Sequence, residues 1–537
     1  MLRILKKNYF FLLILSFLIY SAVTIFQSSF IVQGVRYFSL SDDEMIGMRY
    51  AYNLVHGHGF VWNPGEHVEG ITNPLWVAYM ALIHLLPISL SKTSLAIQIS
   101  ATLIIVVTLY FVKKIAALLS NSSSFVIFFS VLFTAFYFPL FNWSVILGTE
   151  VSVLTLLLTW SAFLTLQTVK SKKFSPLLFF LLGIGTLVRM DFLIPAIVIN
   201  TYLLIFDRKN RRKYLILGIP LIVIFLTLQT FFRLWYYHDI LPNTYYYKMT
   251  GYPVLRRITR GIFVSLKAFS QILLSTNLLL IFAPFAYAYF SKNKQIILLL
   301  SLFATQVAYN SYVGGDVWEY YGGANRFVAF AMPLFFISLI VSIHFFGKVI
   351  QSKIANIKKQ YQIIEILSLF FIFLVVNRAN ENVLPHLFLL AKPTTVIENQ
   401  PRVQLANCVL AATKPNAKIA AASTGIVPYL TKRYYVDILG RTDKTLASEA
   451  AHDETKYGST RNKYVSFSPG HNKWDYPYLI KKYRPDVFTE IYAFEYNKQH
   501  LMHDYVKMVS REGCSFYVLK NSPNIITGNL KPQLGNW

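Results

Sequence analysis

The sequence predicts a polytopic α-helical membrane protein with a smaller α/β domain at its C-terminal end. Hydrophobic residues make up 55% of the 537 residues, and charged residues only 14%. The apolar residues gather in repeated stretches that are long enough to cross a bilayer. After residue 377 no apolar run of that length follows, and polar residues become dense. We therefore expect a membrane domain over residues 1–377 and a soluble domain over residues 378–537.

The basic residues predict which side of the membrane the loops face. Lys and Arg number 51 against 25 Asp and Glu, which gives a net charge of +26. A basic patch on a soluble domain would suggest nucleic-acid binding, but many of these cations stand in short clusters between apolar runs. That distribution is typical of the cytoplasmic loops of a multi-pass protein. The lipid bilayer is therefore an expected partner, and nucleic acid is not.

The first apolar run is predicted to be a retained transmembrane span. It covers residues 9–30 and follows Arg3, Lys6 and Lys7. The run is longer than the hydrophobic part of a typical signal peptide, and no convincing A-x-A cleavage site follows it. About eleven spans are expected in all, with the later ones at residues 95–112, 123–143, 147–168, 174–188, 192–206, 214–232, 272–290, 295–312, 327–346 and 361–377.

The predicted topology has the N-terminus in the cytoplasm and the C-terminus outside. The basic turns then fall on the cytoplasmic side, at residues 113–114, 170–173, 207–213, 291–294 and 347–360. The segment PLWVAYMALIHLL (74–86) is too short to span. Asn73 followed by Pro74 is a typical helix start, so we expect this helix to lie on or dip into the outer leaflet.

The large first external loop, residues 31–94, contains three adjacent acids in SDDEMIGMRYAYNL (41–54). Ser41 and Glu44 form a capping box, and acids in a first helical turn suit the helix dipole, so structure alone can explain them. The alternative is that Asp42 or Asp43 is a catalytic base at the membrane surface. Ten of the twelve acids in residues 1–377 lie on the outer side in this topology, which favours a polar site there.

The C-terminal segment reads as a small α/β domain. Four segments are predicted as buried strands: AKIAAASTGIVPYL (417–430), RYYVDILG (433–440), RPDVFTEIY (484–492) and CSFYVLK (514–520). Both cysteines of the chain, Cys408 and Cys514, lie here. In an oxidising compartment they can pair, but two buried free thiols are at least as well supported by the sequence.

A set of short motifs, in order along the chain, resembles a known group of enzymes. The motifs are SDDEMIGMRYAYNLVHGHGFVWNPGEHVEGITNPLW (41–76), ILGTE (146–150), TLVRMDFLIP (186–195), HDILPNTYYYK (238–248), YVGGDVWEYYGGANRFVAFAMP (312–333), STGIVPYLTKRYYVDILGRTD (423–443) and SPGHNK (468–473). The set resembles a bacterial group of GT-C membrane glycosyltransferases that includes the mycobacterial terminal β-(1→2)-arabinofuranosyltransferase. It also resembles the hydrophobic LphB-type proteins of Legionella.

The resemblance implies an inverting transferase on the outer face of a bacterial cytoplasmic membrane. Such an enzyme moves one sugar from a polyprenyl-phosphate donor to a cell-envelope glycan, such as lipopolysaccharide, or to a glycolipid or protein acceptor. The chemistry needs a base for the acceptor hydroxyl and cations for the leaving phosphate. By motif, Asp42 or Asp43 is the base.

Other residues receive provisional roles in substrate binding. Arg49 and Arg326 are candidates for the donor phosphate, because a guanidinium can grip two oxygens. Further candidates sit at outer span ends or within the matching motifs: Glu150, Arg189, Asp191, Asn243, Asp316 and His471. Arg189 and Asp191 can instead simply pair with each other. A divalent cation, Mg²⁺ or Ca²⁺, is the cofactor that paired aspartates would hold.

Two other classes of function compete with the enzyme. A secondary transporter would need inverted repeats and polar groups near the bilayer midplane, and the sequence shows neither. A non-catalytic envelope scaffold would have no need of an acidic pair next to the outer domain.

Overall fold

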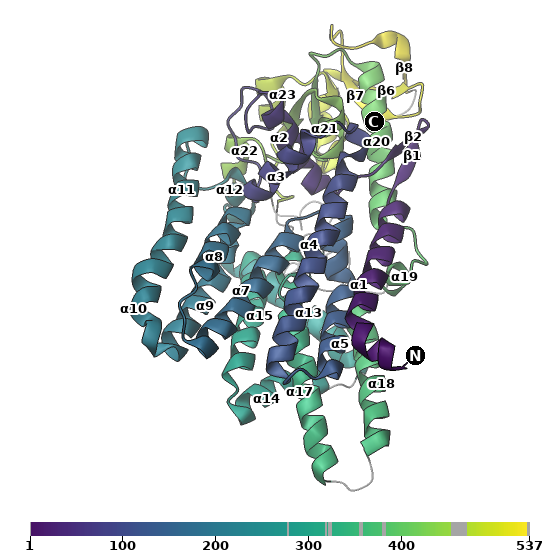
Figure 1. The fold of residues 1–537 in the computed structure, drawn as a ribbon. Helices are drawn as coiled ribbons and strands as arrows, with labels where there is room; N and C mark the ends of the chain where they lie inside the picture. The colour runs from purple at the N-terminus through teal and green to yellow at the C-terminus, as the bar shows by residue number, and fades with distance from the viewer. Residues whose placement is uncertain are drawn as a thin grey trace. The chain divides into compact units, whose positions relative to one another are not determined.

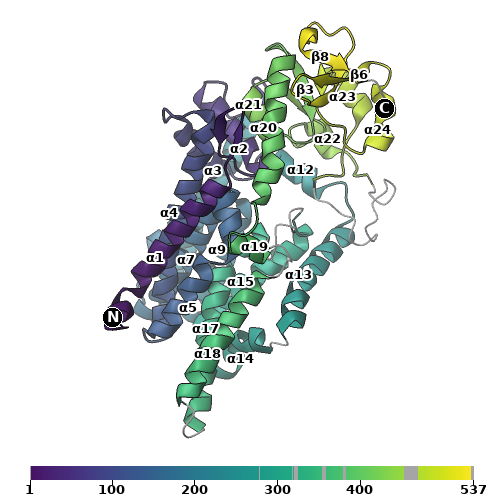
Figure 2. The same cartoon turned by 90° about the vertical axis from the view of Figure 1, so that its right-hand side faces the viewer.

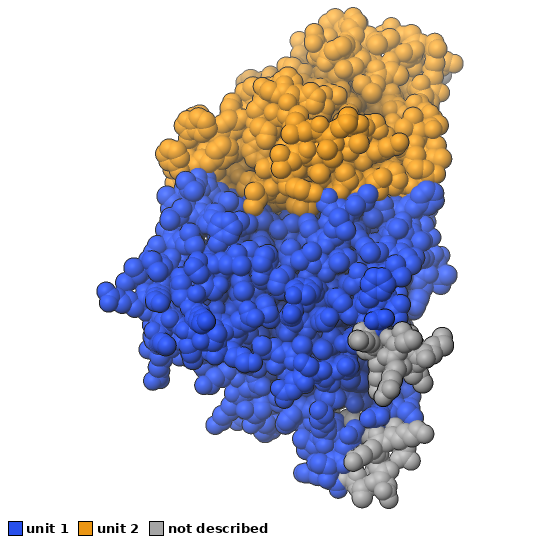
Figure 3. Space-filling view, viewed as in Figure 1, with its two compact units in different colours: residues 1–27, 98–229, 258–392 blue, residues 28–97, 230–257, 393–537 orange. Residues whose placement is uncertain are grey.

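The computed structural model describes residues 2–276, 279–316, 319, 325–353, 358–378, 383–452 and 470–533, with the backbone alone for residues 2–7, 270–276, 279–280 and 358–361. The chain divides into two compact units, coloured separately in Figure 3. Unit 1 comprises residues 1–27, 98–229 and 258–392, and unit 2 comprises residues 28–97, 230–257 and 393–537. The predicted first external loop thus belongs to the same unit as the C-terminal residues.

The regular elements of unit 1 are all helices among its described residues. Its elements are α1 (Leu2–Gln27), α5 (Ser124–Ala135), α6 (Phe138–Phe141), the π-helical turn η1 (Asn142–Ile146), α7 (Val151–Ser171), α8 (Pro176–Val188), η2 (Met190–Phe192), α9 (Leu193–Phe206), η3 (Arg208–Asn210), α10 (Arg211–Lys213), η4 (Tyr214–Gly218), η5 (Leu279–Phe282), α14 (Ala283–Ser291), α15 (Lys294–Val313), α16 (Arg326–Ala329), α17 (Met332–Lys353), α18 (Lys358–Asn377) and α19 (Val383–Leu387). Three helices have residues in both units: α4 (Leu90–Leu119), α11 (Ile219–Tyr237) and α13 (Val254–Thr276). Figures 1 and 2 both show α17 lying beside α18.

Several helices are long and apolar enough to cross a membrane, which confirms a multi-pass protein. Among the described residues six helices qualify: Asn8–Gln27, Leu90–Leu119, Val151–Ser171, Arg208–Tyr237, Lys294–Val313 and Met332–Lys353. The bent pair Ser124–Ala135 and Phe138–Ile146 makes a seventh if it is one span. The 52° bend lies at Phe136 and Tyr137, and Pro139 in the first turn of α6 has no N–H with which to continue the hydrogen bonding of α5. Shorter apolar helices occupy 176–188, 190–206 and 362–377.

The predicted span at residues 272–290 is wrong in its bounds. Helix α13 runs from Val254 to Thr276 and ends inside that segment. The 3-10 turn η5 and the separate helix α14 follow, and α14 has Pro284 in its first turn. Proline favours a helix start and disfavours a helix interior, so the apolar residues here do not form one continuous helix.

Unit 2 combines helices with a mixed sheet. Its own elements are β1 (Phe30–Val32), β2 (Val35–Tyr37), α2 (Asp42–Val55), α3 (Pro74–His84), α12 (Asn243–Met249), α20 (Thr394–Ala412), β3 (Lys418–Ala421), α21 (Ile426–Thr431), β4 (Tyr434–Asp437), α22 (Lys444–Ser448), α23 (Tyr476–Tyr483), β5 (Val487–Phe488), α24 (Phe494–Leu501), β6 (Tyr505–Ser510), β7 (Ser515–Leu519), η8 (Thr527–Asn529) and β8 (Leu530–Pro532). The strand order is β4-β3-β5-β7-β6-β8, with β3 parallel to both β4 and β5. The remaining pairs are antiparallel.

Each of the four predicted strand segments supplies one strand of this sheet, but residues 426–430 of the first segment belong to helix α21. Strands β3, β4, β5 and β7 lie within the segments that begin at residues 417, 433, 484 and 514. The sheet packs on a core that includes Tyr476, Phe488 and Tyr505. The cysteines form the Cys408–Cys514 disulfide, so the paired alternative is the one that the fold adopts.

Local signals in the first loop also act as predicted. The Ser41 side chain accepts a hydrogen bond from the Glu44 backbone N–H at 3.3 Å, which is half of the predicted capping box. Helix α2 ends at Val55, and Gly57 then adopts a positive φ of 78°. Helix α3 begins at Pro74 and is only 11 residues long, which agrees with the predicted short helix.

Candidate functional site

Asp42, the first residue of α2, caps another helix. Its carboxylate accepts hydrogen bonds from the backbone N–H groups of Gly425 at 3.2 Å and Ile426 at 2.9 Å. These are the N-terminal groups of α21, which have no partners within that helix. A side chain on Gly425 would overlap the Asp42 carbonyl oxygen, so glycine alone allows this approach.

Asp43 forms an ion pair with Arg441, at 3.6 Å from Oδ1 to Nη2. The Arg441 guanidinium also donates from Nη1 to the Thr424 hydroxyl at 2.8 Å. Its side chain is 9% exposed, whereas the Asp43 side chain is 21% exposed. Asp43 therefore has a cationic neighbour and is also reachable from solvent.

Several neighbouring groups stabilise the charged form of Arg441. Burial lowers its pKa, but Asp43, Tyr247 and Asp437 raise it by more, so the net shift is upward. Asp437 accepts hydrogen bonds from the backbone N–H groups of Leu439 and Thr442, at 3.0 and 3.1 Å. Burial raises the pKa of Asp437 although Arg441 opposes this shift. Arg441 consequently remains a cation inside an otherwise buried polar cluster.

Asn243, predicted to bind substrate, supports the backbone around Arg441. Its side-chain amide donates to the carbonyl oxygens of Gly440 at 3.2 Å and Arg441 at 2.7 Å. Its own N–H donates to the Glu69 carbonyl at 3.0 Å, and Asn243 is 4% exposed. These contacts fix the turn that presents Arg441. The structure thus gives Asn243 a positioning role, and its contact with substrate stays a prediction.

Arg49, predicted to bind the donor phosphate, forms hydrogen bonds with other residues of unit 2. Its guanidinium donates to the carbonyls of Trp62, Pro428 and Arg433 and to the Asn63 side chain, at distances between 2.6 and 3.0 Å. The guanidinium also lies 4.8 Å from the centre of the Trp62 ring. Four of its N–H groups are occupied, and the residue is 4% exposed. This geometry corrects the expectation from sequence, because Arg49 joins α2 to α21 and β4 instead of facing an open surface.

In unit 1, three of the predicted residues meet in one buried cluster. Arg189 makes two bonds to the Asp191 carboxylate, at 3.0 and 2.7 Å, and one to Glu150 at 3.1 Å. The Arg189 guanidinium lies 4.8 Å from the centre of the Phe327 ring. Asp191 thus pairs with Arg189 as the simpler alternative expected, and Glu150 completes the cluster.

Asp316 and Arg326 form a second pair in unit 1. The Asp316 Oδ2 and Arg326 Nε atoms are 2.8 Å apart, and the Arg326 side chain is 12% exposed. Arg260 lies next to this pair, because its Nη2 donates to the Asp316 carbonyl at 3.0 Å and to Glu319 at 2.9 Å. Residues 317–318 and 320–324 of this motif lie outside the described residues.

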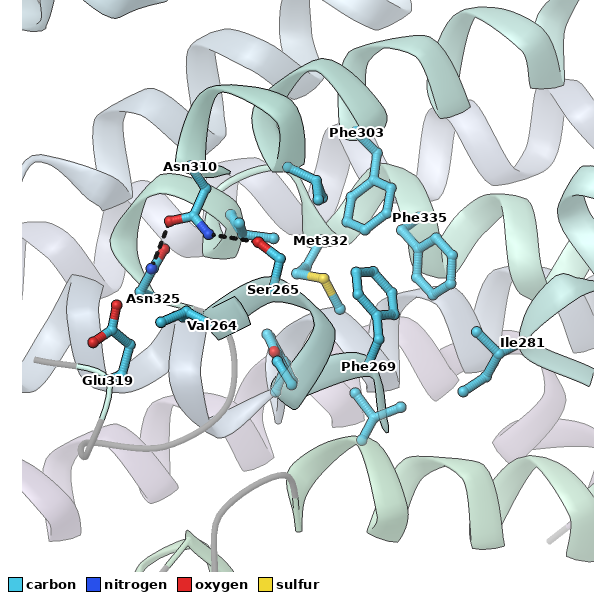
Figure 4. A pocket seen from close by; sticks show the side chains of 15 residues that line it. Val264, Ser265, Phe269, Ile281, Phe303, Asn310, Glu319, Asn325, Met332 and Phe335 are labelled. Atoms are coloured by element: carbon cyan, nitrogen blue, oxygen red, sulfur yellow. Dashed lines mark hydrogen bonds between the residues drawn. The ribbon is translucent and has the colours of Figure 1, made fainter. Parts of the chain in front are cut away.

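Unit 1 also holds a narrow pocket that is mostly apolar (Figure 4). Its apolar end is formed by Phe269, Phe303 and Phe335 with Ile281, and its volume is about 70 Å³. The polar end is a short relay that Figure 4 shows as dashed lines. There Asn325 donates to Asn310 at 2.7 Å, and Asn310 donates to Ser265 at 3.1 Å. Glu319 lies at the same end.

Two further predictions concern His471 and a divalent cation. The His471 ring lies in unit 2, 6.4 Å from the Tyr492 ring, and its role toward substrate stays a prediction. Residues 468–469 of its motif lie outside the described residues. Within the described part of the chain, no group of three or more His, Cys, Asp or Glu side chains could hold a metal ion. Asp42 and Asp43 already receive N–H donors and a guanidinium, so the fit to a divalent cation is poor here.

Sequence reasoning missed Arg441, Thr424 and Arg260. The first two lie inside the matching segment at residues 423–443, where an arginine four residues after the end of buried β4 was an available signal. Arg260 was missed because its helix, α13, was not recognised.

Comparisons with known proteins support the fold. Residues 394–519 match a family described as "Domain of unknown function (DUF8728)". No curated protein matches the sequence. The apo crystal structure of ArnT from Cupriavidus metallidurans is similar with a TM-score of 0.50 and 12% identity, covering 98% of this chain and 99% of that chain. The structure of the same protein bound to undecaprenyl phosphate is similar with a TM-score of 0.52 and 11% identity. This match covers 96% of this chain and 99% of that chain.

A third solved structure is the apo oligosaccharyltransferase of Archaeoglobus fulgidus. It has a TM-score of 0.52 and 8% identity, covering 98% of this chain and 77% of that chain. At such identities the likeness is one of fold. The chain therefore has the GT-C fold, a helical membrane part with a C-terminal sheet domain, as the sequence predicted.

Proposed function

We propose that this protein is an inverting GT-C glycosyltransferase of the outer face of the bacterial cytoplasmic membrane. It would move a single sugar from a polyprenyl-phosphate donor to a cell-envelope glycan, glycolipid or protein. The observation that carries this proposal is the ion pair of the partly exposed Asp43 with the buried Arg441 in a chain of GT-C fold. The similar ArnT structure is described as bound to undecaprenyl phosphate, which supports a lipid-phosphate donor.

In the proposed reaction Asp43 is the base and Asp42 is a structural cap. Both oxygens of Asp42 accept backbone N–H groups, whereas Asp43 forms an ion pair with Arg441 and its side chain is 21% exposed. The acceptor hydroxyl attacks the anomeric carbon, the bond from that carbon to the phosphate oxygen breaks, and the phosphate leaves with the electron pair. The hydroxyl proton passes to Asp43. Arg441 orients the carboxylate and stabilises its charged form before the reaction.

Unit 1, considered by itself, supplies residues that we propose for binding a lipid phosphate. Arg326 is the candidate there, because its side chain is 12% exposed and Arg189 already has two carboxylate partners. The narrow phenylalanine-lined pocket is too small for a sugar ring in addition to a lipid, but its lining suits a slender hydrocarbon chain such as the end of a polyprenyl group.

The test is a comparison of three variants in cells that lack the native protein. Asp43→Asn should lower transfer by about 10²- to 10⁴-fold, as loss of a general base does, and lipid-linked sugar should accumulate. Glu44→Gln is the matched control, because glutamine can still accept the bond from Asn73. Asp42→Asn should leave transfer near normal, because the amide oxygen of asparagine can still accept an N–H group of α21 and asparagine caps about as well as aspartate. Mass spectrometry of surface glycans and of polyprenyl-linked sugars measures both pools.

Normal glycans with Asp43→Asn would contradict the proposal and favour the scaffold. Loss of transfer with Asp42→Asn alone, at normal protein levels, would exchange the roles of the two aspartates.

A further inference from the structure

Unit 2 contains a second pocket, far larger than the one in unit 1. Its volume is about 520 Å³, and it lies between residues 449–452, the start of α23 and helix α24. The residues that matter for its chemistry are Glu449, His452, Asp475, Tyr496, Gln499 and His500. The volume falls in the range of about 300–1,000 Å³ that small-ligand pockets have, which is room for one or two sugar rings.

Flat rings line part of this pocket. Tyr496 on α24 is 44% exposed, which leaves much of its side chain open to solvent. The His452 ring is stacked on Trp474, with centroids 4.2 Å apart and an angle of 20° between the planes. A bond of 2.8 Å between His452 Nε2 and the Trp474 carbonyl also holds it. An aromatic face with a fixed orientation suits the apolar C–H face of a sugar ring.

The polar groups of the pocket suit hydroxyl groups. Glu449 and Asp475 offer carboxylate oxygens as acceptors, and the exposed Gln499 and His500 offer donors as well as acceptors. One Asp475 oxygen already accepts the Tyr478 N–H at 2.9 Å, which fixes this carboxylate at the start of α23. A hydroxyl both donates and accepts, so it can pair with each of these groups.

Other ligand classes fit less well. Among the described residues that line the pocket none is Lys or Arg, so this part of the lining favours a neutral ligand over phosphate, sulfate or nucleic acid. The lining mixes apolar side chains with two carboxylates, and the carboxylates disfavour a lipid chain. A cationic peptide is the remaining competitor because of the two carboxylates, but the nearby Lys473 offsets the charge of Glu449.

We propose that this pocket binds a neutral glycan segment. If the protein is the proposed transferase, this pocket is the subsite for its acceptor, and that role rests on the proposed function. The binding of a glycan does not depend on it.

The test measures binding without transfer. Full-length protein in phosphatidylcholine nanodiscs, free of sugar-based detergent, is examined by saturation-transfer NMR with maltose, lactose and cellobiose as probes and tetralysine as the cationic comparator. At least one disaccharide should give a signal, and Tyr496→Ala should lower it about tenfold or more. Tyr245→Ala is the matched control, because Tyr245 is also in unit 2 and is 40% exposed. It should keep the signal, and Asp43→Asn should keep it too.

Three results would overturn the proposal: no signal from any of the disaccharides, equal signals with Tyr496→Ala and Tyr245→Ala, or binding of tetralysine alone. If Asp43→Asn leaves envelope glycans normal while Tyr496→Ala loses disaccharide binding, glycan binding is supported and the transferase proposal fails by itself.

Discussion

At the scale of single residues, the two adjacent aspartates of α2 have different surroundings. Successive residues of an α-helix point about 100° apart, so the hydrogen-bonding partners of Asp42 and Asp43 can differ. Asp42 meets the N-terminus of α21, and Asp43 meets Arg441. The adjacency that marks these residues in the sequence therefore reflects one structural and one proposed catalytic carboxylate.

Lys473 gives a residue-scale prediction about pH. Burial lowers its pKa to about 8, and its ammonium group donates to the carbonyls of Tyr246 and Ala447. Between about pH 8 and pH 10.5 the unfolded chain holds a proton on this group that the folded protein has lost. Stability contributed by this residue should therefore rise with pH in that window and be lost as pH falls through 8.

The measurement is thermal unfolding of purified protein at pH 7.5, 8.5 and 9.5. One proton changes the free energy of unfolding by at most about 1.4 kcal/mol per pH unit. Lys473→Met should remove this contribution and flatten the slope relative to the unaltered protein. Identical slopes for both proteins would show that the Lys473 proton is not linked to folding.

At the scale of elements, the approach of α2 to α21 builds the proposed site. The close fit at Gly425 brings the Asp42 carboxylate onto the α21 N-terminus, and Arg49 reaches the Pro428 carbonyl of the same helix. Asp43 and Thr424 flank this contact, and both bind Arg441. Small movements of α21 should therefore alter the site as a whole.

Gly425→Ala tests this contact between elements. The added methyl group would overlap the Asp42 backbone, so α21 must shift, and we expect a loss of about 1–3 kcal/mol as for other overpacked positions. Gly528→Ala is the matched control, because a Cβ there meets no atom within 4 Å. Thermal unfolding of the two variants measures the difference. Equal melting temperatures would show that the α2–α21 contact is loose.

At the scale of the whole molecule, the chain alternates between the two units. Residues 28–97, 230–257 and 393–537 form unit 2 although long helical stretches separate them in sequence. The Cys408–Cys514 disulfide closes a separation of 106 residues within this unit, which reduces the entropy of the unfolded chain. Unit 2 is therefore assembled from three segments that alternate along the sequence with the segments of unit 1.

The predicted topology depends on residues 254–291, where three helical elements replace the one expected span. If this segment crosses the membrane once, a reporter enzyme fused after Gly251 should report the exterior and one fused after Asn293 the cytoplasm. Fusions after Lys113 and Arg212 serve as controls and should report the cytoplasm, as their basic clusters indicate. The same side for Gly251 and Asn293 would overturn the span count and the exterior C-terminus together.

The sequence by itself determined the features that depend on local pattern. Apolar length defined the membrane helices, the Ser41 cap and Gly57 set the ends of α2, and hydrophobic segments located four strands of the sheet. The expected span at 272–290 had the wrong bounds, because Pro284 favours the start of a new helix even within a continuous apolar run.

Only the tertiary structure decided which side chains act together. Asp42 meets Gly425 across 383 positions of sequence, and Arg49 meets Arg433 across 384. Periodicity and capping are local properties, so they leave such pairings open. The pairings follow from how α2, α21 and β4 pack, since a buried charge is stable only where packing supplies its partners. For this reason the sequence could place an acidic pair at a helix start, and the fold alone could give each aspartate a different environment.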